Sequence, residues 1–290
     1  MFNSRRTSLS SLLSPYLLGV LLLVILPALV TFAAAFFRYD GFNPPQWVGL
    51  INFQLIRREP LFGVALANSY WFILLAVPVR ILGALGLALF YTRPRPALGF
   101  YRAAAYLPTV IPDVAYALLW SWIFNPLVGP LNHILMAMGL PAPAWLTDPH
   151  WALPALVLMS GFQLGEGFVI LLAGLRHIPR DSIEAARVEG ASPWQIFTLI
   201  SLPLLSPWLV LLTVRDVVLS FQNTFTPATI MTGGGPYYAT YFLPTLIYET
   251  AFDAMHFGQA AALTLLVFAI TILLSIFLFS LFEGWGFDES

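Results

Sequence analysis

Six long apolar runs, almost free of charge, constrain what this chain of 290 residues can fold into more than any other feature. Each run exceeds the roughly 20 residues that a helix needs to cross about 30 Å of hydrocarbon. Because a backbone in lipid must satisfy its own hydrogen bonds, the runs predict helices. A β-barrel would need short alternating segments instead. The sequence therefore predicts an all-α membrane protein with six transmembrane helices, at about residues 15–37, 61–91, 103–124, 151–175, 204–225 and 257–282.

The scarcity of charge supports this prediction and excludes several classes of protein. Charged residues make up 9% of the chain and hydrophobic residues 59%. A typical soluble domain carries about 25% charged residues, so this chain cannot build a water-facing coat. Its net charge of −1 excludes a basic nucleic-acid footprint. The chain has no cysteine and its four histidines show no ligand spacing, so we expect no disulfide and no metal site.

The arginines predict which helix ends face the cytoplasm, because cytoplasmic loops carry an excess of basic residues. Only Arg38, Arg57 and Arg58 lie in loops on one side. Eight lie on the other side, and these are Arg5, Arg6, Arg93, Arg95, Arg102, Arg176, Arg180 and Arg187. Both termini are therefore expected in the cytoplasm. The segment from Ser4 to Thr7 resembles a twin-arginine export signal, but the apolar run after it is too long, so we expect a retained first helix.

The expected cytoplasmic loop at residues 176–207 carries signals for two short helices. Asp181 is expected to cap the first helix, because Glu184 follows three residues later, as in a capping box. Gly190 stands where a left-handed glycine ends a helix. The composition fits both an amphipathic loop on the membrane surface and a docking element for a partner.

The second short helix is expected to begin at Ser192. This residue can cap the helix, and Pro193 then stands at the first position, where its missing N–H costs nothing. Pro203 and Pro207 are expected to end the helix and lead into the fifth span.

Polar groups inside the apolar runs are candidate functional residues, because such groups are expensive in lipid. Gln163 and Glu166 stand three positions apart and are expected on one face of the fourth helix. Gln222, Asn223 and Thr224 close the fifth span. The alternative role of each is an interhelical hydrogen bond, worth about 0.6 kcal/mol on average.

Charged residues also occur inside the expected spans. Arg215 and Asp216 are adjacent, so they face about 100° apart on a helix and are not expected to pair with each other. Either could pair with Glu166 or Arg80 across helices, which would make Glu166 a structural partner rather than a ligand. Asp113 is expected near the outer end of the third span, within reach of water.

The loop at residues 176–207 matches a known signature at every position. Its pattern, E-A-A-x3-G-x9-I-x-L-P, is that of the membrane subunits of bacterial ABC importers, and the chain resembles this family. The matching residues are Glu184, Ala185, Ala186, Gly190, Ile200, Leu202 and Pro203. The chain from about Asn68 onward is also similar to the maltose-type carbohydrate-uptake branch, as at Tyr106-Leu107-Pro108, Phe124-Asn125-Pro126 and Thr232-Gly233-Gly234-Gly235-Pro236.

The resemblance implies a single ABC-importer type I transmembrane domain over residues 1–290, with its core at about 62–282. In that family two permeases pair, usually as a heterodimer, above two ATP-binding cassette subunits, and an extracytoplasmic binding protein delivers the substrate. The location implied is the bacterial or archaeal cell (inner) membrane. The chain has no phosphate-binding loop, so partner ATPase subunits would bind ATP and Mg, and no cofactor is expected on this chain.

The resemblance also implies roles for particular residues. The loop at residues 176–207, here named the coupling loop, would be the cytoplasmic coupling helix between helices 4 and 5, and its seven signature residues would dock it in a cleft of the ATPase. A sugar would contact the region of Gln163, Glu166, Phe221, Gln222, Asn223 and Thr224. Polar groups beside the aromatic faces of Phe162 and Phe221 suit the hydroxyl groups and apolar C–H patches of a sugar.

Several functions remain open on the sequence. The leading one is an importer permease for a sugar or oligosaccharide, and the alternative is a permease for glycerol-3-phosphate or another polyol phosphate. A phosphate substrate would need arginine in the path, which Arg80 or Arg215 could supply. An ion-coupled secondary transporter could use Glu166, Arg215 and Asp216 as a proton relay, but no inverted repeats are evident. An intramembrane enzyme lacks a nucleophile–base pair.

Overall fold

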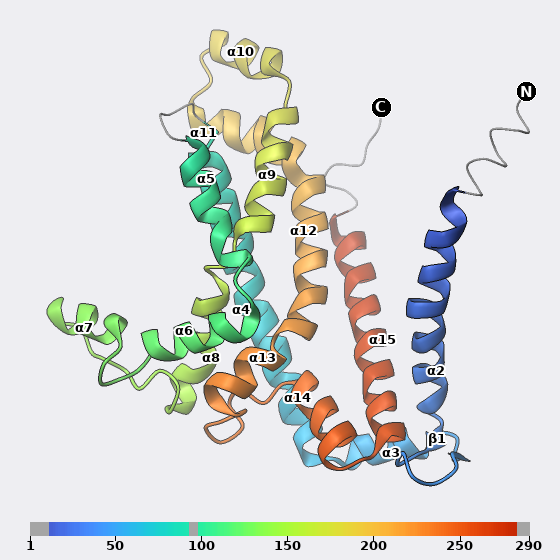
Figure 1. Ribbon diagram of the computed structural model, residues 1–290. Coiled ribbons are helices and arrows are strands. Elements are labelled where there is room, and N and C mark those ends of the chain that lie inside the picture. The colour runs from blue at the N-terminus through green and yellow to red at the C-terminus, as the bar shows by residue number, and fades with distance from the viewer. Residues whose placement is uncertain (1–11, 93–97, 283–290) are drawn as a thin grey trace, which may run out of the picture. The chain divides into compact units, whose positions relative to one another are not determined.

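The computed structural model describes residues 12–92 and 98–282 (Figure 1). Most of these residues are helical. The chain divides into two compact units, one comprising Met1–Phe62 with Leu246–Ala269 and the other Gly63–Thr245 with Ile270–Ser290.

Four helices are long and apolar enough to cross a membrane, or up to six if each of two bent pairs is one span. The four are Leu12–Ala34, Pro60–Phe90, Pro193–Thr232 and Phe257–Leu281. The expected third and fourth spans are not single straight helices. Leu98–Thr109 and Asp113–Ile123 meet at 95°, and Pro149–Ser160 and Gly165–His177 meet at 48°.

The first unit combines a long apolar helix with a small antiparallel sheet. Its elements are η1 (Leu21–Ile25), α2 (Leu26–Ala34), β1 (Phe37–Arg38), β2 (Gln46–Trp47), α3 (Ile51–Arg58) and η5 (Glu249–Asp253). Phe37 pairs with Trp47 in the sheet, which the all-helical prediction missed. The first part of α15 (Phe257–Phe282) also belongs to this unit.

Asparagine and aspartate side chains hold the irregular backbone of this unit. The buried Asn52 amide donates to the carbonyl groups of Ala35 and Phe37, at 2.8 and 2.9 Å. Asp40 accepts hydrogen bonds from the backbone N–H groups of Asn43 and Phe42 and from the Asn43 side chain. These hydrogen bonds, the one from the Asn43 backbone foremost, lower the pKa of Asp40 to about 2.

The second unit contains the remaining helices. They are α4 (Pro60–Phe90), α5 (Leu98–Tyr106), η2 (Leu107–Thr109), α6 (Asp113–Ile123), α7 (Pro130–Ala137), α8 (Pro149–Ser160), α9 (Gly165–His177), α10 (Arg180–Val188), α11 (Pro193–Ile196), η3 (Phe197–Ser201), α12 (Leu202–Asn223), α13 (Phe225–Pro227), η4 (Ala228–Thr232) and α14 (Leu243–Tyr248). The first residues of α4, up to Phe62, and the last residues of α14, from Leu246, belong to the first unit. The last part of α15, from Ile270, belongs to the second unit.

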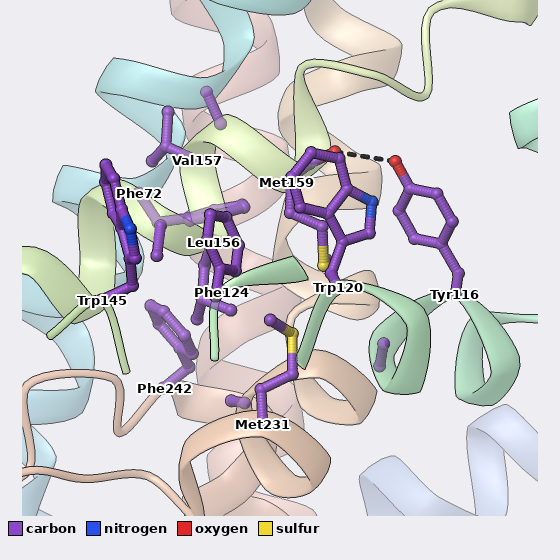
Figure 2. Close-up of a cluster of buried hydrophobic side chains, with 14 residues drawn as sticks. Phe72, Tyr116, Trp120, Phe124, Trp145, Leu156, Val157, Met159, Met231 and Phe242 are labelled. Atoms are coloured by element: carbon purple, nitrogen blue, oxygen red, sulfur yellow. Dashed lines mark hydrogen bonds between the residues drawn. The ribbon is translucent and has the colours of Figure 1, made fainter. Parts of the chain in front are cut away.

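An aromatic cluster packs α6, α8 and the segment around α7 together (Figure 2). Phe124 lies at its centre, with ring centroids 5.0 Å from Trp120 and 5.5 Å from Trp145. The Tyr116 hydroxyl donates to the Met159 carbonyl at 2.9 Å and so ties α6 to α8. The cluster therefore fixes α6, the second helix of one bent pair, against α8, the first helix of the other.

A second core packs α9 against α12. Gly174 of α9 lies against the Trp208 ring, so closely that a Cβ atom there would come within 2.9 Å of it. His177, at the end of α9, lies with its ring centroid 6.0 Å from that of Trp208. Glycine thus allows these two helices to approach closely at the end that leads into the coupling loop.

Candidate functional site

The coupling loop folds into α10 and α11, beyond the ends of α9 and α12 (Figure 1). Gly190 follows α10 with φ +83°. Its N–H donates to the Arg187 carbonyl at 3.1 Å, and the Ala191 N–H donates to the Ala186 carbonyl at 2.9 Å. This is a Schellman ending, which needs a left-handed residue at that position. The expected glycine turn is confirmed.

The start of α10 differs from the prediction. Pro179 precedes the helix, no side chain caps it, and Asp181 lies within the first turn. The extended backbone at Pro179 starts the helix early, so Asp181 is too far along to act as the N-cap. Glu184 and Ala185 are exposed and Ala186 is partly buried, so this signature segment presents side chains at the surface.

The start of α11 confirms the prediction that Ser192 is the cap. The Gln195 N–H donates to the Ser192 hydroxyl at 3.3 Å, and the Ser192 N–H donates to the Gln195 side-chain oxygen at 2.8 Å. This is a capping box with glutamine as the second partner.

The end of this second helix does not confirm the prediction. Pro203 and Pro207 do not end it, because α11, η3 and α12 form a continuous helix. The helix widens to one π-helical turn just before Pro203, where the Leu202 N–H donates to the Phe197 carbonyl. Such a turn relieves the clash that a proline ring makes with a regular α-helix. The signature residues Ile200, Leu202 and Pro203 therefore lie on the helix that continues into the expected fifth span.

A polar cavity of about 160 Å³ lies among α4, α9, α12 and the bend between η2 and α6. Two bent helix pairs contribute to it at their breaks, Asp113 being the first residue of α6 and Glu166 the second of α9. Its polar lining residues are Arg80, Thr109, Asp113, Gln163, Glu166, Arg215, Asp216 and Asn223. We call this space the polar cavity.

Two interhelical ion pairs run along the polar cavity. Arg80 Nε of α4 lies 2.8 Å from Asp216 Oδ2 of α12, and the same guanidinium donates to the Ser220 hydroxyl. Arg215 of α12 pairs with Glu166 of α9. The first pair is shielded, with side chains 15% and 14% exposed, whereas Arg215 and Glu166 are 35% and 50% exposed. The pairing of Glu166 supports its alternative, structural role.

Arg215 and Asp216 also interact, against the prediction from their adjacency. Arg215 Nη1 lies 3.8 Å from Asp216 Oδ1. The long arginine side chain spans the angular separation between neighbouring helical positions. The four charges thus form one alternating chain in the order Arg80, Asp216, Arg215 and Glu166.

A smaller cavity of about 50 Å³ shares Arg80, Gln163 and Asn223 with the polar cavity. Thr224 lines it and is buried, and its hydroxyl has no hydrogen-bond partner among the described residues. A buried polar atom without a partner is uncommon. This hydroxyl is therefore available to a water molecule or to a hydroxyl of a ligand.

The structure brings together only part of the predicted substrate path. Gln163, Glu166 and Asn223 line the polar cavity, although Gln163 lies in the break before α9 rather than on one continuous helix with Glu166. Phe221 is buried and Gln222 is exposed, and neither lines the two cavities.

Aromatic contact and charge at the cavity also differ from expectation. Phe162 packs on Trp120, with ring centroids 5.0 Å apart, rather than lining either cavity. Asp113 lines the polar cavity at the 95° bend, and it is exposed, which confirms the expectation that water reaches it. Its position after Ile-Pro was the only sequence signal for this bend, because proline disfavours helix at the preceding residue.

Known proteins resemble this chain over most of its length. It is 32% identical to the probable ABC transporter permease protein YesP of Bacillus subtilis, over 96% of this chain and 91% of that protein. It is 29% identical to the probable starch degradation products transport system permease protein AmyD of Thermoanaerobacterium thermosulfurigenes, over 91% of this chain and 90% of that protein. It is 30% identical to the sn-glycerol-3-phosphate transport system permease protein UgpA of Agrobacterium fabrum, over 94% of this chain and 93% of that protein.

The fold has a solved counterpart. A chain in the crystal structure of a bacterial ABC transporter involved in the import of the acidic polysaccharide alginate superposes with a TM-score of 0.81. The superposition covers 97% of this chain and 96% of the solved chain. The two sequences are 22% identical, so the likeness shows a common fold. Residues 80–284 match the family described as binding-protein-dependent transport system inner membrane component. This protein is therefore a multi-pass membrane protein that belongs to the family of binding-protein-dependent transport system inner membrane components.

Proposed function

We propose that this chain is the membrane-spanning permease subunit of an ATP-driven ABC importer for a sugar or oligosaccharide. The coupling loop carries the proposal, because its signature segment is exposed and its turn is fixed by the Gly190 ending and the Ser192 capping box. Family membership and the relative named for starch degradation products support it.

The assembly that this function requires contains several further chains. We propose a second permease that forms a heterodimer with this one, two ATP-binding cassette subunits that bind ATP and Mg, and an extracytoplasmic binding protein. The chain itself would hydrolyse no ATP. Its two units would form one type I transmembrane domain with six spans, counting each bent pair as one, and both termini in the cytoplasm of a bacterial or archaeal cell.

The coupling loop would transmit ATP binding to the polar cavity. Glu184, Ala185 and Ala186 would rest in a cleft of the ATPase, with the Gly190 turn setting the angle between α10 and α11. The helices on both sides of the loop, α9 and α12, carry Glu166 and Arg215. Movement of the loop would therefore reach the cavity through two packed helices, which is a change driven by differential contacts with the partner.

The charges of the polar cavity favour a neutral sugar over a polyol phosphate. Phosphate is held best by a free arginine fork. Both arginines that line the cavity among the described residues are already paired with carboxylates, and Asp113 adds a third carboxylate. Two arginines face three carboxylates, which opposes an anion. The relative named for sn-glycerol-3-phosphate keeps the phosphate alternative open to test.

Purification of the intact complex through a tag on this chain tests the proposal. We expect a second permease and an ATPase to co-purify, and labelled neutral sugars to enter proteoliposomes only with ATP and the binding protein. Excess sn-glycerol-3-phosphate should not compete. Competition by the phosphate would favour the alternative, and uptake that a protonophore abolishes while the ATPase is inactive would indicate a secondary transporter.

A further inference from the structure

Asp113 is the unpaired charge of the polar cavity. Its carboxylate is exposed and makes no ion pair or hydrogen bond with another described residue. The other four charged side chains that line the cavity are linked in one chain of ion pairs. The proposed transport of a sugar assigns no role to this carboxylate.

Asp113 faces a cavity that α12 also lines. Asp113 begins α6 directly after the 95° bend, so the angle of that bend sets how far its carboxylate lies from α12. Arg215, on α12, faces the same cavity and belongs to a helix that runs without interruption from the coupling loop. A movement of the coupling loop that displaced α12 would therefore change the separation between Arg215 and Asp113.

The pairing of Arg215 leaves room for a further carboxylate. Its side chain is 35% exposed and the Glu166 side chain is 50% exposed, so water reaches this pair. Arginine presents five N–H donors in a planar fork and can bind more than one carboxylate. The pair of Arg80 and Asp216, by contrast, is shielded, and Arg80 also donates to the Ser220 hydroxyl, so this pair is fixed.

We propose that Asp113 is a latch residue, which binds Arg215 when the polar cavity closes during the transport cycle. This inference rests on the proposed function, because the ATP-driven cycle supplies the closure. Closing the cavity would bring the first turn of α6 to α12 and extend the chain of ion pairs to a fifth member. In the present structure Asp113 and Arg215 line the same cavity without an ion pair between them.

The competing explanation is that Asp113 only stabilises α6. A carboxylate in the first turn of a helix interacts favourably with the helix dipole. That role predicts that Asp113→Asn lowers the melting temperature and leaves the closure of the cavity unchanged. A latch predicts a change in the closure itself.

The absence of cysteine from this chain allows a direct measurement. Val114 lies beside Asp113 and is 54% exposed. Leu211 lies one turn before Arg215 and is 51% exposed. Val114→Cys with Leu211→Cys, in the complete importer with cysteine-free partner chains, gives two sites for nitroxide labels. Pulsed electron paramagnetic resonance then measures the distance between α6 and α12, without nucleotide and after trapping with ATP and vanadate.

We expect one of the two nucleotide states to contain a population with a shorter distance. Asp113→Asn should lower the ratio of the shorter to the longer distance about fivefold, as for directly interacting charges. Asp113→Glu should restore that ratio. The matched control is Asp253→Asn, which removes an exposed carboxylate that does not line the cavity.

Each other outcome overturns the latch. An unchanged distance distribution in Asp113→Asn, with or without a lower melting temperature, leaves Asp113 only its effect on the helix. Equal effects of Asp113→Asn and Asp253→Asn would show a general effect of charge. ATP-driven uptake without any change between α6 and α12 would remove the latch but retain the proposed function. Absence of ATP-driven uptake in the unaltered importer would disprove both the latch and the proposed function.

Discussion

The coupling loop and the polar cavity, both parts of the second unit, are stabilised by opposite kinds of interaction. The loop is built from hydrogen bonds between residues at most five positions apart, such as Ala191 to Ala186 and Gln195 to Ser192. The cavity depends on the contact between Arg80 and Asp216, which are 136 positions apart. No residue of α10 in the loop is buried, whereas the Arg80–Asp216 pair is shielded.

The loop is therefore the part of the site that can move as a unit. A loop whose turns are locally closed keeps its shape when a partner displaces it. A cavity whose walls are joined by ion pairs from separate helices changes when those helices move. The four predictions below test this comparison, from the largest expected effect on stability to the smallest.

Removing one partner of the shielded ion pair should have the largest effect. Arg80→Ala leaves the Asp216 carboxylate with only the 3.8 Å contact to Arg215, and we expect a loss of about 3 kcal/mol of stability. The yield and melting temperature of the detergent-extracted complex measure it. As a control, Arg80→Met combined with Asp216→Met should recover most of the loss, because no uncompensated charge remains. A single variant as stable as the unaltered chain would contradict the structural role of this pair.

Changing the glycine turn of the coupling loop should uncouple transport. Gly190→Val forces a β-branched residue to φ +83°, at a strain of about 1–3 kcal/mol, although no atom lies within 4 Å of the added Cβ. Because about 1.4 kcal/mol of strain shifts an equilibrium tenfold, we expect sugar uptake per ATP hydrolysed to fall about tenfold, with insertion unchanged.

The control for this turn is Gly190→Asn. Asparagine tolerates the left-handed conformation, so this variant should retain most of the coupling. Unimpaired uptake by Gly190→Val would disprove the docking role of the loop.

Removing the capping box should loosen the second helix of the loop alone. Ser192→Ala deletes the acceptor of the Gln195 N–H, and we expect a loss of about 1 kcal/mol of local stability. Faster hydrogen exchange at the α11 amides, with unchanged exchange in α4, measures this loss. Ser182→Ala, which changes an exposed serine of α10, is the matched control. Equal exchange in the two variants would show that the cap does not hold the loop.

Removing the exposed carboxylate of the cavity should have the smallest effect on stability. Glu166→Ala breaks a half-exposed pair, which is worth about 0–1 kcal/mol, so the complex should still assemble. Uptake should nevertheless be impaired, because Glu166 lines the polar cavity. Size-exclusion chromatography and transport assays on the same preparation separate these effects. Failure to assemble would show that Glu166 is a structural partner.

The sequence predicted the loop better than it predicted the cavity. Gly190 and Ser192 act through their own backbone neighbours, so their roles could be read from local order. Asp181 was misassigned because the helix start depends on the backbone angles of Pro179. The effect of Pro203 was misjudged because one π-helical turn before it lets the helix continue.

The cavity could be anticipated only as a set of polar residues. Gln163, Glu166 and Asn223 were expected and do line it, whereas Phe221 and Gln222 do not. Asp113 was not expected there, because the 95° bend that turns it toward the cavity has no unique sequence signal. Which charges pair depends on where two spans break, and apolar periodicity does not report this.

From the amino-acid sequence alone it follows that this chain belongs in lipid, that most of it is helical, and where the coupling loop turns. These properties follow from composition and from interactions between near neighbours. The bends within two helix pairs, the pairing of both Arg80 and Arg215, and the lack of a partner for Asp113 among the described residues became visible in the tertiary structure alone. The physical reason is that an ion pair between helices depends on their packing and bending, which are set by contacts between distant residues.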